Sequence, residues 1–249
     1  MSSPQSLTDL LTASTARHGA RPLFLTKIDD VWRETSYRQF GGMVDHLRAG
    51  LAALGVSPGD AVGIIAKNSV EWAAAAFATY GRRAAFVPMY ESQGPEDWAF
   101  IARDSGLKVL LVATAEIAAA MQKLRGTIPT LKHLVLLGEA GGGDRTFRSL
   151  LDAGAKQPAE LLRPQPGDIA CLLYTSGTMG NPKGVVLTHA NIIANVVALA
   201  QVIPLSEEYR TLSILPWAHA FGHTVELHMV ITCGASIAIA ESVDKIIDN

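Results

Sequence analysis

Cysteine is nearly absent from this chain of 249 residues: only Cys171 and Cys233 are present, far apart and without a C-x-x-C spacing. So few cysteines exclude a disulfide framework and favour buried free thiols in a reducing compartment. An excess of charge is also lacking, because the formal net charge is −2. A nearly balanced charge gives no electrostatic basis for binding nucleic acid.

Targeting and membrane signals are missing as well. The N-terminus, MSSPQSLTDLL, has no basic region followed by an apolar run, which argues against a secretion signal. Residues 184–206 carry no charged side chain, but polar residues and Pro204 interrupt them, which favours a buried helix over a transmembrane segment. The sequence predicts a cytoplasmic protein, with peripheral attachment to a membrane as the alternative.

The apolar residues, 49% of the chain, are arranged as alternating strands and helices. From residue 61 on, short β-branched runs alternate with amphipathic stretches, which predicts an α/β fold of mostly parallel, doubly wound sheets with helices on both faces. A hairpin over 23–35 and a helix that Ser36 begins precede this part. Asn68 and Glu71, three positions apart, predict a capping box for the helix that ends at Tyr80.

Three prolines in residues 157–167 indicate a crossing between two parts of the chain. We therefore expect an N-terminal α/β subdomain over 1–156 and a second α/β subdomain over 157–249, incomplete at its C-terminus. The last residues, SVDKIIDN, begin a helix and stop within two turns. We expect the chain to be the front part of a longer protein.

The stretch YTSGTMGNPKGVVLTH, residues 174–189, concentrates hydroxyls, glycines and one lysine between two apolar runs. Glycine lets the backbone approach a ligand closely. Hydroxyls and backbone N–H groups donate to anionic oxygens, and Lys183 adds a point charge. The composition predicts a strand–loop–strand device that binds a triphosphate, in preference to a plain Gly/Ser/Thr turn.

This loop is not a Walker A site. The pattern G-x-x-x-x-G-K-[ST] needs glycine before the lysine and a hydroxyl after it, but the chain has Pro182 and Gly184 there. The following residues, GVVLT, predict a strand where a P-loop ATPase has a helix.

A second stretch, LPWAHAFGHTVELH, follows the predicted strand 211–215. His219 lies beside aromatic residues at the end of a strand, where α/β proteins place ligands, so we expect it to line a pocket. His219, His223 and His228 raise the question of a metal site, but no H-E-x-x-H pattern or acidic ligand accompanies them. For His223 and His228 we favour helical core positions.

Taken together, these stretches resemble the adenylate-forming superfamily of acyl-CoA synthetases, luciferases and peptide-synthetase adenylation domains. YTSGTMGNPKG resembles the family signature YTSGTTGxPKG, and LPWAHAFG resembles the next motif, LPxxHxxG. VSPGDAVGIIAKNSVEWAAAAFA and FVPMY also resemble the family pattern, so the likeness covers nearly the whole chain. Among the branches, the chain is most similar to long- or medium-chain fatty acyl-CoA ligases.

The resemblance implies a reaction in two halves: a fatty acid and ATP give acyl-adenylate and pyrophosphate, and coenzyme A then displaces AMP. It implies ATP, Mg²⁺ and coenzyme A as cofactors, and catalytic roles for Lys183 and Thr175. Thr175 matches the position that helps to hold Mg²⁺. The residues implied to bind the ATP phosphates are Thr175, Ser176, Gly177, Thr178, Gly180 and Lys183, and those implied to line the acyl site are His219, Phe221 and Gly222.

The sequence departs from the family pattern in two ways. Met179 replaces the usual threonine and removes one hydroxyl donor from the loop. The Y-G-x-T-E motif, the ribose aspartate and the C-terminal lid with its lysine are not found before Asn249, so we expect little or no ligase turnover from this chain alone. An apolar face opened by truncation would favour a homodimer. Two alternatives stay open: adenylation of an aryl or amino acid, and a stand-alone nucleotide-binding module.

Overall fold

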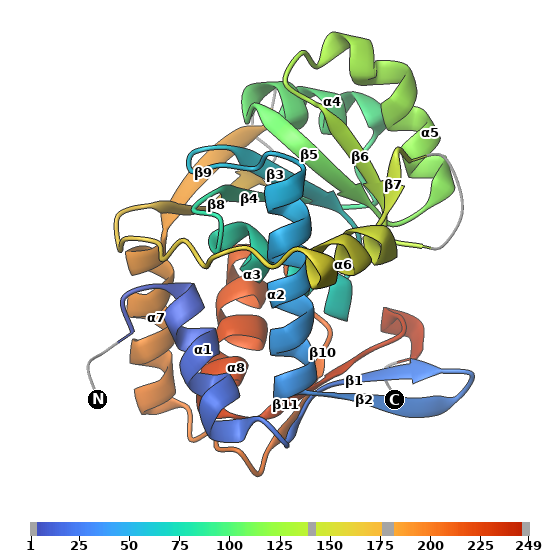
Figure 1. Ribbon diagram of the computed structural model, residues 1–249. Coiled ribbons are helices and arrows are strands. Elements are labelled where there is room, and N and C mark those ends of the chain that lie inside the picture. The colour runs from blue at the N-terminus through green and yellow to red at the C-terminus, as the bar shows by residue number, and fades with distance from the viewer. Residues whose placement is uncertain (1–3, 139–142, 176–181, 246–249) are drawn as a thin grey trace.

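The structure is a computed structural model that describes residues 4–138, 143–175 and 182–245. Its strands form two sheets (Figure 1). In spatial order, the seven-stranded sheet contains β7 (Arg145–Thr146), β6 (His133–Leu136), β5 (Leu107–Val112), β3 (Ala61–Ile65), β4 (Ala85–Met89), β8 (Ile169–Thr175) and β9 (Lys183–Thr188). The four-stranded sheet contains β10 (Arg210–Ser213), β11 (Ser236–Ile239), β1 (Pro22–Ile28) and β2 (Val31–Ser36).

Both sheets are mostly parallel, as the alternation of strands and helices predicts. The antiparallel pairs are the β1–β2 hairpin and the β8–β9 hairpin, each at one edge of its sheet. The helices are α1 (Leu7–His18), α2 (Tyr37–Ala53), α3 (Val70–Tyr80), α4 (Pro95–Asp104), α5 (Ala115–Leu124), α6 (Phe147–Lys156), α7 (His189–Val202) and α8 (Val230–Cys233). A π-helix, η2 (Gly222–Met229), precedes α8, and the 3₁₀ turns are η1 (Arg125–Thr127) and η3 (Val243–Lys245).

Helices cover both faces of the larger sheet, which confirms the predicted fold class (Figure 1). Helices α4 and α5 pack on one face and form a core of their own with the strands. Helices α2 and α3 pack on the other face, in a core that also includes the smaller sheet. The alanines of α3 are fully buried there, because small side chains let a helix approach its neighbours closely.

The start of α3 differs from the prediction. Its N-cap is Ser69, whose hydroxyl accepts a hydrogen bond from the backbone N–H of Trp72, so the capping box that we expected from Asn68 and Glu71 is wrong. The physical reason is that the amide of Asn68 is already used, since it bonds to Ser213 at the end of β10 and to the backbone of Leu215 and Trp217. The helix therefore begins one residue later.

Each sheet takes strands from both sides of the expected boundary between residues 156 and 157. Strands β8 and β9 extend the larger sheet, while β1 and β2 belong with β10 and β11 in the smaller one. The division of the chain into subdomains 1–156 and 157–249 stays a prediction. The two sheets do not separate the chain at a single residue.

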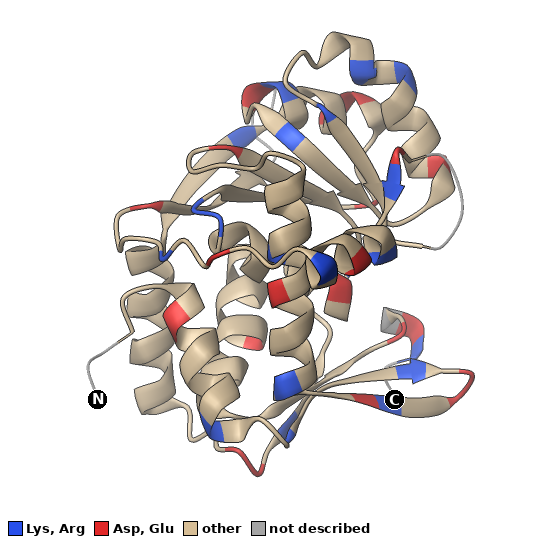
Figure 2. Ribbon diagram, viewed as in Figure 1, with Lys and Arg blue, Asp and Glu red and all other residues tan. Residues whose placement is uncertain are grey.

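Basic and acidic residues are interspersed along the ribbon (Figure 2). None of the helices in the described ranges combines the length and the hydropathy needed to cross a bilayer. Cys171 is buried and Cys233 is partly buried, and both are free thiols, as predicted.

Candidate functional site

The β8–β9 hairpin frames the predicted phosphate-binding loop. Thr175 at the end of β8 pairs in register with Lys183 at the start of β9, so the two ends of the loop lie opposite each other. Four predicted phosphate ligands between them, Ser176, Gly177, Thr178 and Gly180, lie outside the described residues. The two strands predicted on either side of these residues are confirmed.

Lys183 and Thr175 are both exposed at the mouth of this hairpin. Within the described residues, the Lys183 ammonium has no ion-pair partner. An exposed ammonium beside a hydroxyl is a suitable donor pair for an anionic oxygen. The arrangement leaves both groups accessible to a ligand.

Tyr174 stiffens the hairpin one residue before the loop. Its hydroxyl donates to Asp104 Oδ2 at 2.6 Å, and burial together with this carboxylate raises the pKa of the phenol far above its ordinary value. A Cβ on Gly184, the register partner of Tyr174, would lie 3.0 Å from the tyrosine ring. Gly184 therefore serves the packing of this ring.

After β9 the chain enters α7 at a buried histidine. Thr188 caps the helix, and His189 Nδ1 accepts a hydrogen bond from the backbone N–H of Leu7 at 3.3 Å. Burial lowers the pKa of His189 to about 4, so its ring is neutral at neutral pH. The bond ties the strand that begins at Lys183 to the start of α1.

The three residues expected to line the acyl site lie at the junction where the segment after β10 enters η2, and Gly222 is the first residue of η2. His219 is exposed, and its Nδ1 accepts from the backbone N–H of Phe221 at 3.3 Å. Phe221 has 56% of its surface exposed, which is unusual for a large aromatic side chain. Gly222 is buried, and a Cβ there would come within 2.4 Å of the Pro216 carbonyl oxygen.

Two further histidines lie in the core behind this turn, as predicted for His223 and His228. His223 Nδ1 lies 3.1 Å from the Trp217 carbonyl and therefore carries the proton. The single lone pair on His223 Nε2 can then accept either from the Tyr80 hydroxyl at 3.0 Å or from His228 Nε2 at 3.2 Å. Burial lowers the pKa of His223 to about 4 and holds the pKa of His228 well below its ordinary value. No group of three or more His, Cys, Asp or Glu side chains arranged to hold a metal is found in the described ranges.

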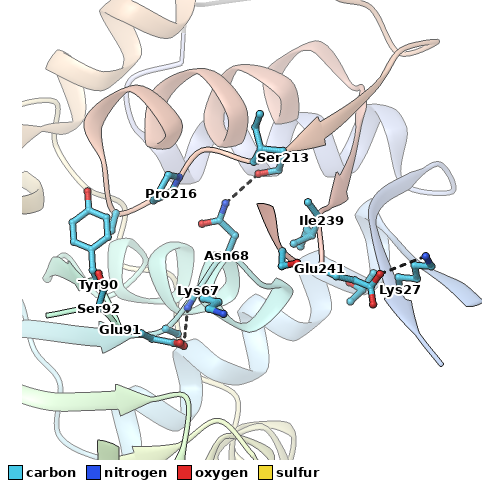
Figure 3. Close-up of a pocket in the computed structure, with 16 residues that line it drawn as sticks. Lys27, Lys67, Asn68, Tyr90, Glu91, Ser92, Ser213, Pro216, Ile239 and Glu241 are labelled. Atoms are coloured by element: carbon cyan, nitrogen blue, oxygen red, sulfur yellow. Dashed lines mark hydrogen bonds and ion pairs between the residues drawn. The ribbon is translucent and has the colours of Figure 1, made fainter. Parts of the chain in front are cut away.

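A cavity of about 440 Å³ opens between the two sheets (Figure 3). Segments that follow the carboxyl ends of β3, β4, β10 and β11 line it, together with residues of β1. Pro216 and Ala218 of the LPWAHAFG stretch line the cavity, whereas His219 and Phe221 are not among its lining residues. Polar lining residues that the sequence reasoning missed are Thr26, Lys27, Lys67, Asn68, Tyr90, Glu91, Ser92, Ser213, Glu241 and Ser242.

Four of these residues carry a common signal in the sequence. Lys67 and Asn68 come directly after β3, and Tyr90 and Glu91 directly after β4. Ligands of α/β proteins bind at the carboxyl ends of parallel strands, so these positions were identifiable once the strands were assigned. An ion pair lies in the cavity, where Lys27 Nζ is 3.4 Å from Glu241, and the Glu91 carboxylate accepts a hydrogen bond from the Lys67 backbone N–H.

Comparison with known families gives one match over nearly the whole chain. Residues 11–248 match the family described as AMP-binding enzyme. Among curated relatives, the long-chain-fatty-acid–CoA ligase FadD15 of Mycobacterium bovis is 33% identical over 217 residues, which cover 83% of this chain and 36% of that protein. The peroxisomal long chain acyl-CoA synthetase 6 of Arabidopsis thaliana is 30% identical, over 75% of this chain and 28% of that protein.

Solved structures of similar shape carry related names. The anthranilate CoA ligase AuaEII, in complex with anthranoyl-AMP, superposes with a TM-score of 0.86 at 26% identity over all of this chain and 47% of its own. The N-terminal domain of FACL13 from Mycobacterium tuberculosis has a TM-score of 0.86 at 23% identity, over 98% of this chain and 59% of its own, which shows the fold alone. The chain spans about a third of the length of the curated relatives it matches.

Proposed function

Because the chain belongs to the AMP-binding enzyme family of adenylate-forming enzymes, we propose that it takes part in the ATP-dependent activation of a carboxylic acid. The observation that carries the proposal is the hairpin geometry, in which Thr175 and Lys183 face each other across the mouth of a loop with the family's phosphate-binding sequence. The whole activity is proposed for the intact protein, of which this chain would supply the N-terminal portion.

The proposed reaction solves a leaving-group problem. A carboxylate is a poor acyl donor because oxide would have to leave. Attack of the carboxylate oxygen on the α-phosphorus of ATP forms an acyl–phosphate bond and releases pyrophosphate. Attack of the coenzyme A thiol on the acyl carbon then forms the thioester and releases AMP, while the thiol proton passes to solvent.

The protein's contribution would be alignment and charge neutralisation. Lys183 would meet negative charge that builds on pyrophosphate, and the hydroxyl of Thr175 would hold Mg²⁺ near the phosphates. The exposure of both groups fits this role, since neither is engaged by a charged partner among the described residues. Ser176, Gly177, Thr178 and Gly180 would donate the remaining contacts of the loop.

We propose a fatty acid as the acid substrate. Support comes from the names of the relatives, which are long-chain fatty-acid ligases at 30–33% identity. His219, Phe221 and the backbone of Gly222 would line the acid end of the site, and the exposed ring of Phe221 supplies apolar surface for a hydrocarbon chain. An aryl acid is the second candidate, because AuaEII at 26% identity is named an anthranilate CoA ligase.

Location and assembly belong to the same proposal. We place the protein in the cytoplasm, with peripheral contact to a membrane as the alternative, and without a nucleic-acid partner. A homodimer is the assembly that we propose for the chain.

The test is ATP–pyrophosphate exchange by the intact protein, with a panel of fatty, aryl and amino acids. Exchange that depends on a fatty acid supports the proposal. A preference for an aryl or amino acid would replace the fatty-acid assignment but leave adenylation in place. Absence of exchange with every acid, in the presence of MgATP and a folded protein, would remove the proposed activity.

A further inference from the structure

Asn68 connects the two halves of the fold through its side chain. It follows β3 of the larger sheet, and its Nδ2 donates to the Leu215 carbonyl at 2.8 Å and to Ser213 Oγ at 3.1 Å. Its Oδ1 accepts from the Trp217 backbone N–H at 2.8 Å. Figure 3 shows the amide pointing across the cavity to Ser213, at the end of β10 in the smaller sheet.

The hydrogen bonds determine the orientation of this amide. If oxygen and nitrogen were exchanged, the NH₂ group would face the Trp217 N–H, and the oxygen would face the Leu215 carbonyl. In the observed orientation both amide hydrogens have acceptors and the oxygen has a donor. Such full satisfaction of one half-buried side chain favours a single geometry of the segment it contacts.

Glu226 also holds this segment. It lies in the π-helix η2, and its carboxylate accepts from Ser213 Oγ at 2.5 Å and from the Leu215 N–H at 3.1 Å. Ser213 thus donates to Glu226 and accepts from Asn68, which links the three side chains in a row. Isolated π-helical turns are uncommon and often occur at functional sites.

The segment held in this way leads directly into the predicted acid-binding turn. Trp217 is fully buried, and the His219 N–H donates back to the Pro216 carbonyl at 3.0 Å. The exposed residues His219 and Phe221 therefore follow a segment, residues 215–217, whose backbone is fixed by hydrogen bonds. Asn68, which fixes this segment, follows β3. Strand β3 neighbours β4, and β4 neighbours β8, so the segment is attached to the same sheet that carries Thr175.

We propose that Asn68 is a positioning residue, which sets the place of the turn with His219 and Phe221 relative to the phosphate-binding hairpin. This inference rests on the proposed function for its catalytic meaning. Asn68 acts through the backbone of residues 215 and 217 and does not itself contact the reacting atoms. A purely stabilising role would affect the whole fold, whereas a positioning role affects this turn first.

Hydrogen exchange of backbone amides separates the two roles without any activity. The variant Asn68→Ala removes the acceptor of the Trp217 N–H, so this amide should exchange roughly tenfold faster or more. Amides in the middle of α3 and α5 should keep their rates. Asn195→Ala, a change of the same chemical kind on the exposed face of α7, is the matched control and should leave the Trp217 amide unchanged.

The variant Asn68→Asp sharpens this experiment. Aspartate retains an oxygen acceptor for the Trp217 N–H but loses both donors, so protection at Trp217 should persist while the bonds to Leu215 and Ser213 are lost. An equal acceleration of all protected amides in Asn68→Ala, or no acceleration at Trp217, would overturn the positioning role.

Kinetics of the intact protein then tests the catalytic meaning. In pyrophosphate exchange, Asn68→Ala should raise the KM for the acid by roughly tenfold and leave the KM for ATP within about twofold. Equal effects on both constants would contradict the inference. If the wild-type protein exchanges with no acid, the proposed function fails, and the amide-exchange experiment still decides whether Asn68 holds the turn.

Discussion

A methyl group at Gly222 should destabilise the fold by a predictable steric route. The added Cβ would lie 2.4 Å from the Pro216 carbonyl oxygen, 3.0 Å from its carbonyl carbon and 3.2 Å from the Leu215 carbonyl oxygen. All three atoms belong to the backbone, so the clash can be relieved only if the backbone of residues 215 and 216 shifts. Overpacking of this kind costs about 1–3 kcal/mol of unfolding free energy.

Two other glycines provide an internal scale for this prediction. Gly42 in α2 has no atom within 4 Å of the place that a Cβ would occupy, so Gly42→Ala should gain roughly 0.5–1 kcal/mol from the better helix propensity of alanine. At Gly154 in α6 the Cβ would come within 1.8 Å of the His46 carbonyl oxygen, where α2 and α6 pack together. Gly154→Ala should therefore lose more than Gly222→Ala.

Urea unfolding of the three variants, followed by tryptophan fluorescence and by circular dichroism, measures these differences. The expected order of stability is Gly42→Ala above wild type, then Gly222→Ala, then Gly154→Ala. A Gly222→Ala variant as stable as wild type would refute the close packing of the turn on η2. It would then also remove the structural explanation for glycine at this position.

Other parts of the molecule give three further predictions. Because burial lowers the pKa of His189 and His223 to about 4, while the unfolded chain has ordinary histidines, the unfolded state binds more protons between pH 6.5 and 4. The free energy of unfolding should therefore be highest above pH 6.5 and should fall by about 1.4 kcal/mol per pH unit for each histidine as the pH drops below 6.5. In urea titrations, His223→Phe should reduce this slope. Ser69→Ala removes the N-cap of α3 and should lower the free energy of unfolding by about 1 kcal/mol, whereas Glu71→Gln should change it by less than about 0.5 kcal/mol. If thermal unfolding ranked the two variants in the reverse order, the predicted capping box of Asn68 and Glu71 would be supported after all. In the intact protein, His219→Ala should alter the KM for the acid and not that for ATP, and steady-state kinetics showing an effect on ATP alone would place His219 in the other pocket.

Local patterns predicted the fold well where one rule acted alone. The strands expected over 61–66 and 184–188 are β3 over 61–65 and β9 over 183–188. The apolar spacing after Ser36 is α2, with a capping box of Ser36 and Gln39. The motif histidines His223 and His228 lie in the core as their surroundings suggested.

The errors and omissions came from contacts between distant residues. Asn68 looks like a helix cap in the sequence, and only the approach of residues 213–217, about 145 positions away, shows its other use. Gly184 looks like a phosphate-loop glycine until the Tyr174 ring is seen packed against it. The cavity between the sheets combines the ends of four strands with residues of β1, and their proximity is a property of the topology that no short stretch encodes.

The central claim, that the loop between Thr175 and Lys183 binds the phosphates of ATP, is tested most directly by pyrophosphate exchange with Lys183→Ala in the intact protein. Loss of one charge-assisted bond of about 1.5–3 kcal/mol predicts a reduction of roughly 10- to 150-fold. Lys123→Ala, at another exposed lysine, should exchange like wild type. Equal exchange by the Lys183 variant and wild type would contradict the account.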